Sequence, residues 1–260
     1  MLLAIDIGNT NVVLGVWDGE EWLIQWRLRT VRNRTADEFG IQLRSLIRDT
    51  ISISMLERIV LCSVVPKLTI SIQEACQRYL KKEPLIISSA LDFGIVNETD
   101  VPELVGADRL ANAVAAYDIT EADTAAIVID MGTATKLDVV TSDGRFPGGV
   151  ISPGLGITAD ALFSRAAKLS QVDLVAPPNV IGRNTVHAIQ SGLVNGYVTM
   201  LEGLVPKIKA EIKEIDPGAA NVIVIATGGL IPVVESATDV IQLSDPWLTL
   251  KGLRLIADRN

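Results

Sequence analysis

The sequence predicts an α/β protein of two similar halves, which we expect to form two α/β domains with a cleft between them. Two observations support this prediction. A strand, a turn with aspartate and glycine, a second strand, an Asp-Gly turn and a third strand open the chain, and the same order returns at residues 126–150. Helix-forming segments follow each copy, and no low-complexity linker separates the halves. We place the domains at residues 1–118 and 119–260.

In the first half, β-rich runs at residues 2–5, 12–17 and 22–28 predict three strands, with Asp18-Gly19 as a hairpin turn. Thr35-Ala36-Asp37-Glu38 matches a capping box, in which the threonine hydroxyl and the glutamate carboxylate each satisfy a backbone amide at the start of a helix. Behind it we expect, in order, a strand at 59–65 ended by Pro66, a helix at 69–80, a strand at 85–88 and a helix from about Ala107.

In the second half, runs at 126–129 and 137–140 repeat the first hairpin, and Ser142-Asp143-Gly144 repeats its turn. Asn184 or Thr185 caps a long helical pattern that we expect to break near Pro206. Gly192 and Gly196 lie four residues apart on it, a spacing that lets another helix approach closely, inside the fold or across a dimer. A buried strand at 222–226 and a closing helix at 248–257 complete the half.

Composition narrows the possible partners. The chain has 260 residues, 48% of them hydrophobic, and a net charge of −8, so we expect no nucleic-acid partner and a small-molecule ligand instead. The two cysteines, Cys62 and Cys76, are too few for a disulfide framework or a zinc site, and Cys62 fits a core position. No apolar run approaches the roughly 20 residues of a membrane span, so we expect a cytoplasmic protein with no membrane partner.

The two aspartate turns suit phosphate binding. In the first, Gly8 lets the backbone approach a phosphate, the amides that follow and the Thr10 hydroxyl donate to its oxygens, and Asp6 can hold Mg²⁺ through water. One such turn is more often a plain hairpin, but the second copy at Asp130 makes a phosphate clamp the better interpretation. A third segment, Thr227-Gly228-Gly229 after a strand, places glycines where a nucleotide base or ribose would lie close to the main chain.

Asp108 and Arg109 open a predicted helix. Asp108 alone fits a first helical turn through the helix dipole, but the dipole disfavours Arg109 there, which suggests an anion to bind. Asp108 is therefore our candidate for the carboxylate that accepts a proton from an alcohol nucleophile. His187 is the only histidine, and we interpret it as a helix-face residue. The glycine-rich stretch at 146–154 fits either a tight connection or a substrate wall.

With these residues in view, the chain resembles the type III pantothenate kinases, of the acetate and sugar kinase, Hsp70 and actin superfold, along nearly its whole length. The matching segments are Asp6 to Asn11, Arg34 to Glu38, Ser63 to Pro66, Gly106 to Arg109, Asp130 to Thr135, Pro153 to Leu155, Gly182 to Thr185 and Thr249 to Arg254. The resemblance implies a duplicated ribonuclease-H-like (actin-like ATPase) fold. It also implies an ATP-binding transferase that phosphorylates pantothenate to 4′-phosphopantothenate, the first step of coenzyme A synthesis.

The resemblance assigns roles residue by residue. It implies Asp108 as the general base, and a homodimer that needs Mg²⁺ with ATP and a monovalent cation, K⁺ or NH₄⁺, held by Asp130. The residues that it implies for ATP are Asp6, Ile7, Gly8, Asn9, Thr10, Asn11, Val12, Val13 and Thr133. Those that it implies for pantothenate are Gly106, Ala107, Asp108, Arg109 and Thr185.

Two positions depart from the family pattern, which usually has tyrosine where Thr99 stands and threonine where Lys136 stands. Thr99 lacks an aromatic wall toward the substrate. Lys136 either replaces the charge of the cation or points into solvent, and solvent is the usual place for a lysine near a hairpin turn. These departures leave open an alternative, a non-catalytic paralogue that binds nucleotide or pantothenate and acts through partner proteins. The hairpins alone would also fit another small-molecule kinase or a polyphosphate hydrolase.

Overall fold

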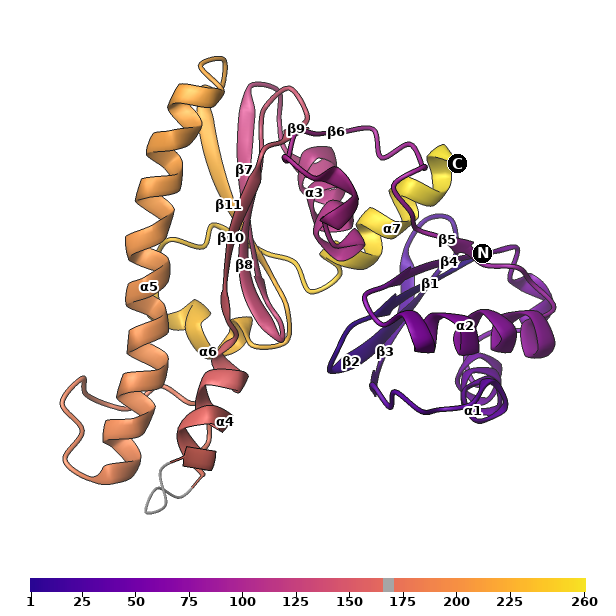
Figure 1. The fold of residues 1–260 in the computed structure, drawn as a ribbon, viewed down its shortest axis with the longest axis horizontal. Coiled ribbons are helices and arrows are strands. Elements are labelled where there is room, and N and C mark those ends of the chain that lie inside the picture. Colours follow the sequence, from indigo (N-terminus) through magenta and orange to yellow (C-terminus); the bar gives the residue numbers. More distant parts are fainter. Residues whose placement is uncertain (166–170) are drawn as a thin grey trace. The chain divides into compact units, whose positions relative to one another are not determined.

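The computed structural model describes residues 1–165 and 171–260, which divide into two compact units (Figure 1). The first contains Met1–Ile95, Asp100–Ala115 and Leu248–Asn260, and the second contains Val96–Thr99 and Ala116–Trp247. Our expected domains, 1–118 and 119–260, differ from these units chiefly at the end of the chain. The last helix, expected in the second domain, belongs to the first unit.

The first unit is built on a five-stranded sheet. Its strands lie in the order β3 (Trp22–Arg29), β2 (Asn11–Trp17), β1 (Leu2–Ile7), β4 (Arg58–Ser63) and β5 (Leu85–Ile86). β1 pairs antiparallel with β2 and parallel with β4. The helices of this unit are α1 (Ala36–Arg48), α2 (Pro66–Ala75), the start of α3 (Ala107–Ile119) and α7 (Leu248–Arg259). Helix α2 continues into a π-helical turn at Cys76–Leu80, and 3₁₀ turns lie at Ile53–Met55 and Pro102–Leu104.

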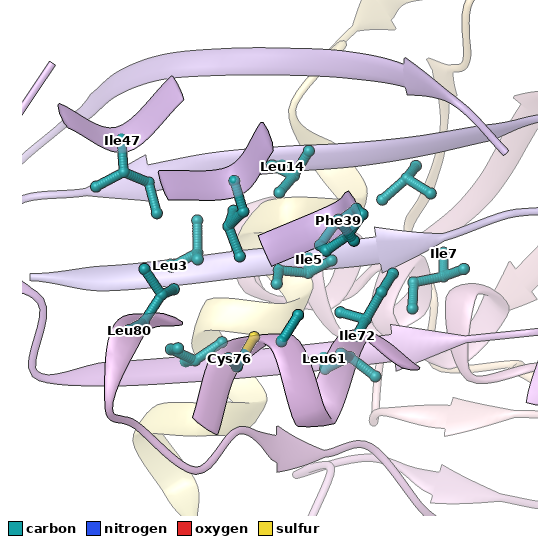
Figure 2. Packing of buried hydrophobic residues seen from close by; sticks show 14 of the residues in the cluster. Leu3, Ile5, Ile7, Leu14, Phe39, Ile47, Leu61, Ile72, Cys76 and Leu80 are labelled. Carbon is teal, nitrogen blue, oxygen red and sulfur yellow. The ribbon is translucent and has the colours of Figure 1, made fainter. Parts of the chain in front are cut away.

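The core of the first unit lies between the sheet and helices α1 and α2. Alternate residues of β1 (Leu3, Ile5 and Ile7) point into it, and α1 and α2 contribute Phe39 and Ile72 among others (Figure 2). Burial of each such side chain contributes about 1.5–3 kcal/mol to folding. Cys62 and Cys76 are buried, as expected for Cys62, and desolvation raises the pKa of the Cys76 thiol to about 12.

The capping box at the start of α1 is confirmed. The Thr35 backbone amide donates to Glu38 Oε2 at 2.8 Å, and the Glu38 amide donates to Thr35 Oγ1 at 3.3 Å. These bonds satisfy two amides that the first turn of a helix leaves without a partner. The predicted helix at 69–80 starts earlier, at Pro66, because proline is well suited to the first helical position.

The second unit repeats the sheet of the first. Its strands lie in the order β10 (Gly148–Pro153), β8 (Ala134–Val140), β7 (Thr124–Met131), β11 (Asn221–Thr227) and β12 (Leu243–Ser244). As in the first unit, the central strand pairs antiparallel with the strand that follows it in the chain and parallel with the next one across. The other elements are β6 (Val96–Asn97) paired with β9 (Arg145–Phe146), α4 (Leu155–Arg165), α5 (Thr185–Ile215), α6 (Ile231–Val234) and a 3₁₀ turn at Glu235–Ala237.

Helix α5 runs along one face of the second sheet and closes its core (Figure 1). Asn184 caps it by accepting a hydrogen bond from the His187 amide at 2.9 Å. The break expected near Pro206 is absent: α5 continues for 31 residues as one helix. Val205 and Ile208 are buried on either side of Pro206, while Pro206 itself is exposed. Packing of this face outweighs the one backbone hydrogen bond that proline removes.

The two small residues on α5 face open space. A Cβ atom added at Gly192 or Gly196 would have no described atom within 4 Å, so the described residues of this chain pack no helix against them. Of the two alternatives for this spacing, approach of another helix inside the fold is therefore excluded for the described residues. Among those residues, no helix is long and apolar enough to cross a membrane.

Candidate active site

The first aspartate turn joins β1 to β2. Asp6 and Ile7 end β1, the residues Gly8, Asn9 and Thr10 form the turn, and Asn11 begins β2. The Gly8 amide donates to the Asn11 carbonyl at 2.9 Å, which closes the turn. Thr30, just after β3, fastens it from outside: its hydroxyl donates to the Gly8 carbonyl at 2.7 Å and its amide to the Thr10 carbonyl at 2.9 Å. The turn is thus held in shape by the protein's own hydrogen bonds, as a preorganised phosphate loop requires.

Asp6 and Asp130 occupy equivalent places in the two sheets. Leu3, Ile5 and Ile7 point into the first core, and Ile127, Ile129 and Met131 into the second. Because side chains alternate along a strand, Asp6 and Asp130 face away from the core of their own unit. Each carboxylate stands near the end of the central strand, beside a glycine-containing turn. This equivalence, which the sequence predicted, is what makes the two hairpins comparable site by site.

The residue opposite each aspartate differs between the hairpins. Asp6 pairs in register with Val13, whereas Asp130 pairs with Lys136. The Lys136 ammonium lies 3.0 Å from Asp130 Oδ2, and the two side chains are only 15% and 16% exposed. The preferred interpretation of Lys136 as a solvent-pointing lysine is therefore wrong. Lys136 is not in the turn but on β8, directly across from Asp130, where opposite charges attract.

Two glycines bring further segments against the second turn. A Cβ atom at Gly228 would lie 2.6 Å from the Met131 carbonyl oxygen, and one at Gly154 would lie 2.3 Å from the Thr133 carbonyl oxygen. Gly228 also has a φ of +106°, a conformation that favours glycine. The Gly154 amide donates to the Thr133 carbonyl at 3.1 Å. The end of the 146–154 stretch is thus a tight connection, one of the two interpretations of this stretch, and it packs against the second turn.

Asp108 lies in the first turn of α3. The Gly106 carbonyl accepts the first helical bond, from the Arg109 amide at 3.0 Å. A Cβ atom at Gly106 would lie 2.5 Å from Asp108 Oδ1, so the carboxylate folds back over the glycine. Ala107, Asp108 and Arg109 are all half-buried. The absence of a side chain at position 106 is what allows Asp108 this position.

Three other predicted positions lie apart from the turns. Thr185 is the exposed first residue of α5. Thr99 is half-buried and engages its own neighbour, since its hydroxyl and amide both donate to Asn97 Oδ1, at 2.8 and 3.2 Å. His187 lies half-buried in the first turn of α5, in line with the helix-face interpretation. Among the described residues, no group of three or more His, Cys, Asp or Glu side chains could hold a metal ion.

Comparison with known proteins settles the family. Residues 2–207 match the model of the type III pantothenate kinase family. The chain belongs to the type III pantothenate kinase family. Proteins named type III pantothenate kinase from Exiguobacterium sibiricum, Moorella thermoacetica and Roseiflexus sp. are 43%, 42% and 44% identical to it, each over 100% of this chain and at least 99% of the relative. The family resemblance expected from the sequence is confirmed.

Solved structures confirm the fold. A Campylobacter jejuni protein assigned to the Baf family of transcriptional activators is 20% identical, with a TM-score of 0.55 over 98% of this chain and 97% of that one. Component A of the Acidaminococcus fermentans (R)-2-hydroxyglutaryl-CoA dehydratase is 14% identical, with a TM-score of 0.54 over 98% and 95%. Together with the duplicated sheet order, these likenesses establish the duplicated actin-like ATPase fold.

Proposed function

We propose that this type III pantothenate kinase family member transfers the γ-phosphoryl group of ATP to the hydroxyl of pantothenate. The product is 4′-phosphopantothenate, and the reaction is the first step of coenzyme A synthesis. One observation carries the proposal: the last residue but one of each central strand is an aspartate that faces away from the core, beside a glycine turn closed by a backbone hydrogen bond. Such turns are suited to polyphosphate, and the family supplies the substrate class.

The turns have distinct roles in this proposal. The segment from Asp6 to Val13 and Thr133 bind ATP phosphates, with backbone amides and hydroxyls as donors. Mg²⁺ neutralises charge on the phosphates as they are transferred, and Asp6 holds it through water. Asp6 suits this role because its carboxylate lies near the end of β1, beside the Gly8 turn, and faces away from the core.

The start of α3 carries the acceptor side of the reaction. Asp108 accepts the proton of the pantothenate hydroxyl, and Arg109 orients the substrate carboxylate. The segment from Gly106 to Arg109 and Thr185 bind pantothenate. The proposal includes a homodimer, since the open face of α5 around Gly192 and Gly196 has room for a second copy. It also includes a cytoplasmic reaction, with which the two reduced cysteines are compatible.

The family resemblance also implies a monovalent cation at Asp130, and here the residues present do not fit. The carboxylate that would bind it already has the Lys136 ammonium 3.0 Å away. A second cation on the same carboxylate would be repelled by the first. No step of the proposed reaction therefore depends on that cation.

Replacement of Asp108 tests the proposed base. Asp108→Asn keeps the size of the side chain and removes its basicity, so kcat should fall by about 10²-fold or more while the KM for ATP changes little. The measurement is pantothenate-dependent ADP release with Mg·ATP in a coupled assay. Asp118→Asn, on an exposed position of the same helix, is the matched control and should retain wild-type kcat.

The outcomes separate the candidate functions. An Asp108→Asn enzyme as fast as the wild type would remove Asp108 from the chemistry. Wild-type protein that binds ATP but releases no ADP with pantothenate would contradict the kinase proposal and favour the non-catalytic paralogue.

A further inference from the structure

Lys136 and Asp130 form a mostly buried ion pair at the second phosphate turn. They are directly opposite each other on β8 and β7, with the Lys136 Nζ to Asp130 Oδ2 distance at 3.0 Å. About 85% of each side chain is shielded, since the exposed fractions are 15% and 16%. A charge pair shielded in this way interacts more strongly than one on the surface, and removal of one partner leaves an uncompensated charge.

A second carboxylate lies on the same face of the sheet as the pair. Asp130 and Asp138 lie on the same face of the sheet, because Lys136 pairs with Asp130 and residue 138 follows Lys136 by two positions on β8. Asp138 is 1% exposed. Thr227, 4% exposed, pairs with Asp130 from the other side, on β11. Lys136 thus shares one face of the sheet with the side chains of Asp130, Asp138 and Thr227, all of which carry oxygen atoms.

The first hairpin has an apolar residue at the place where the second has the lysine. At the equivalent place, Asp6 is opposite Val13, and both aspartates lie near the end of the central strand and face away from the core. The second turn is also one residue shorter, since it joins Met131 to Thr135 whereas the first joins Ile7 to Val12. The charge opposite the aspartate is the chemical difference that bears on cation binding. A lysine at this register position brings a single positive charge on a flexible stem, with three donors.

We propose that the Lys136 ammonium is a built-in monovalent cation at Asp130, so that nucleotide binding and phosphoryl transfer in this protein do not require K⁺ or NH₄⁺. The part of this inference that concerns phosphoryl transfer rests on the proposed function, whereas the part that concerns nucleotide binding does not. Lys136 is a positioning residue in this account: it neutralises Asp130 and holds the second turn, including Thr133, in the form that receives phosphate.

The test compares wild type with two substitutions at the same position. Lys136→Thr removes the charge and opens room for an ion, whereas Lys136→Met removes the charge and keeps the space filled. Pantothenate-dependent ADP release is measured in KCl and in choline chloride at equal ionic strength. We expect the wild-type rates to agree within about twofold, Lys136→Thr to be slower on the order of tenfold in choline and restored by KCl, and Lys136→Met to be slow in both.

A binding measurement makes the result independent of turnover. Calorimetric titration with Mg·ADP should give wild-type protein the same Kd in both salts and Lys136→Thr a lower Kd in KCl than in choline. If no protein turns over with pantothenate but this binding pattern holds, the kinase proposal fails and the inference about Lys136 stands. Lys213→Thr, at an exposed position of α5, should behave as wild type in every arm.

Two results would overturn the inference. The first is wild-type turnover or Mg·ADP affinity that depends on K⁺ as steeply as that of Lys136→Thr. The second is a folded Lys136→Thr protein that KCl does not restore. If Lys136→Thr does not fold, the wild-type titrations alone decide, because independence from K⁺ is the inference and a K⁺ requirement contradicts it.

Discussion

Gly106 fixes where the Asp108 carboxylate lies, because a Cβ atom at position 106 would lie 2.5 Å from Asp108 Oδ1. That contact involves the end of a flexible side chain, so the carboxylate would rotate away and the backbone would stay. Position 106 therefore links a backbone requirement to the chemistry proposed for Asp108.

Gly106→Ala should lower kcat on the order of tenfold to a hundredfold, since a displaced base is poorly oriented toward the hydroxyl. Its free energy of unfolding should change by no more than about 1 kcal/mol. Steady-state kinetics and urea unfolding measure the two effects separately.

A double-mutant cycle gives the control. In the Asp108→Asn background, Gly106→Ala should lower kcat little further, because the side chain that it displaces no longer acts as a base. Losses of kcat that multiply in full would show that Gly106 acts through some group other than Asp108.

At the scale of elements, α7 is the element whose position the sequence did not predict. Its residues contact the rest of the first unit at several points. Among these contacts, the Thr249 hydroxyl donates to Asn112 Oδ1 at 2.7 Å, Gly252 lies against Ala111 of α3, and the Arg254 guanidinium lies 5.0 Å from the centre of the Trp17 ring. The segment Thr249 to Arg254, one of those that match the family, thus ties the end of the chain to the first unit.

Gly252→Ala should destabilise the protein by about 1–3 kcal/mol or more. An added Cβ atom would lie 1.8 Å from the Ala111 carbonyl oxygen and 2.5 Å from its carbon, and backbone atoms cannot move aside as a side chain can. Helix α7 would have to shift away from α3. Urea unfolding measures the change.

Gly203→Ala on α5 is the matched control, since a Cβ atom there meets no described atom within 4 Å. It should leave stability unchanged or raise it by up to about 1 kcal/mol through helix propensity. If Gly252→Ala were as stable as Gly203→Ala, the close approach of α7 to α3 would be contradicted.

Local patterns predicted most elements, and packing decided the rest. The capping box at Thr35 and the strands beside Asp6 and Asp130 follow from short-range chemistry, and they form as predicted. Pro206 does not break α5, because the buried face on both sides of it holds the helix. The pairing of Lys136 with Asp130 follows from the register of the hairpin. Met131 pairs with Thr135, so Asp130 lies opposite Lys136.

The candidate site was predicted as residues but not as geometry. The sequence places an aspartate and a glycine in each turn. It does not say that Gly154 and Gly228 press against the second turn, because those contacts join segments far apart in the chain. In the sequence these contacts are marked only by glycines just after strands β10 and β11, and glycine occurs at strand ends for several structural reasons.

At the scale of the whole molecule, the duplication explains both the fold and the division of roles. Two sheets with the same strand order each present one aspartate turn. The residue across the ladder from the aspartate is Val13 in the first hairpin and Lys136 in the second. We infer that the first turn receives Mg²⁺ with ATP, while the second has the Lys136 ammonium beside its carboxylate. Because the chain as a whole carries a net charge of −8, it would repel a polyphosphate, and positive charge close to the turns offsets that repulsion.

Product analysis in a K⁺-free reaction tests this account most directly. Purified protein is incubated with Mg·ATP and pantothenate in a choline buffer, and the products are identified by mass spectrometry and ³¹P NMR. The account predicts 4′-phosphopantothenate and ADP in equal amounts, at a rate that added KCl changes by no more than about twofold. No phosphorylated pantothenate in either salt would contradict the proposed kinase, and product only in KCl would contradict the role of Lys136.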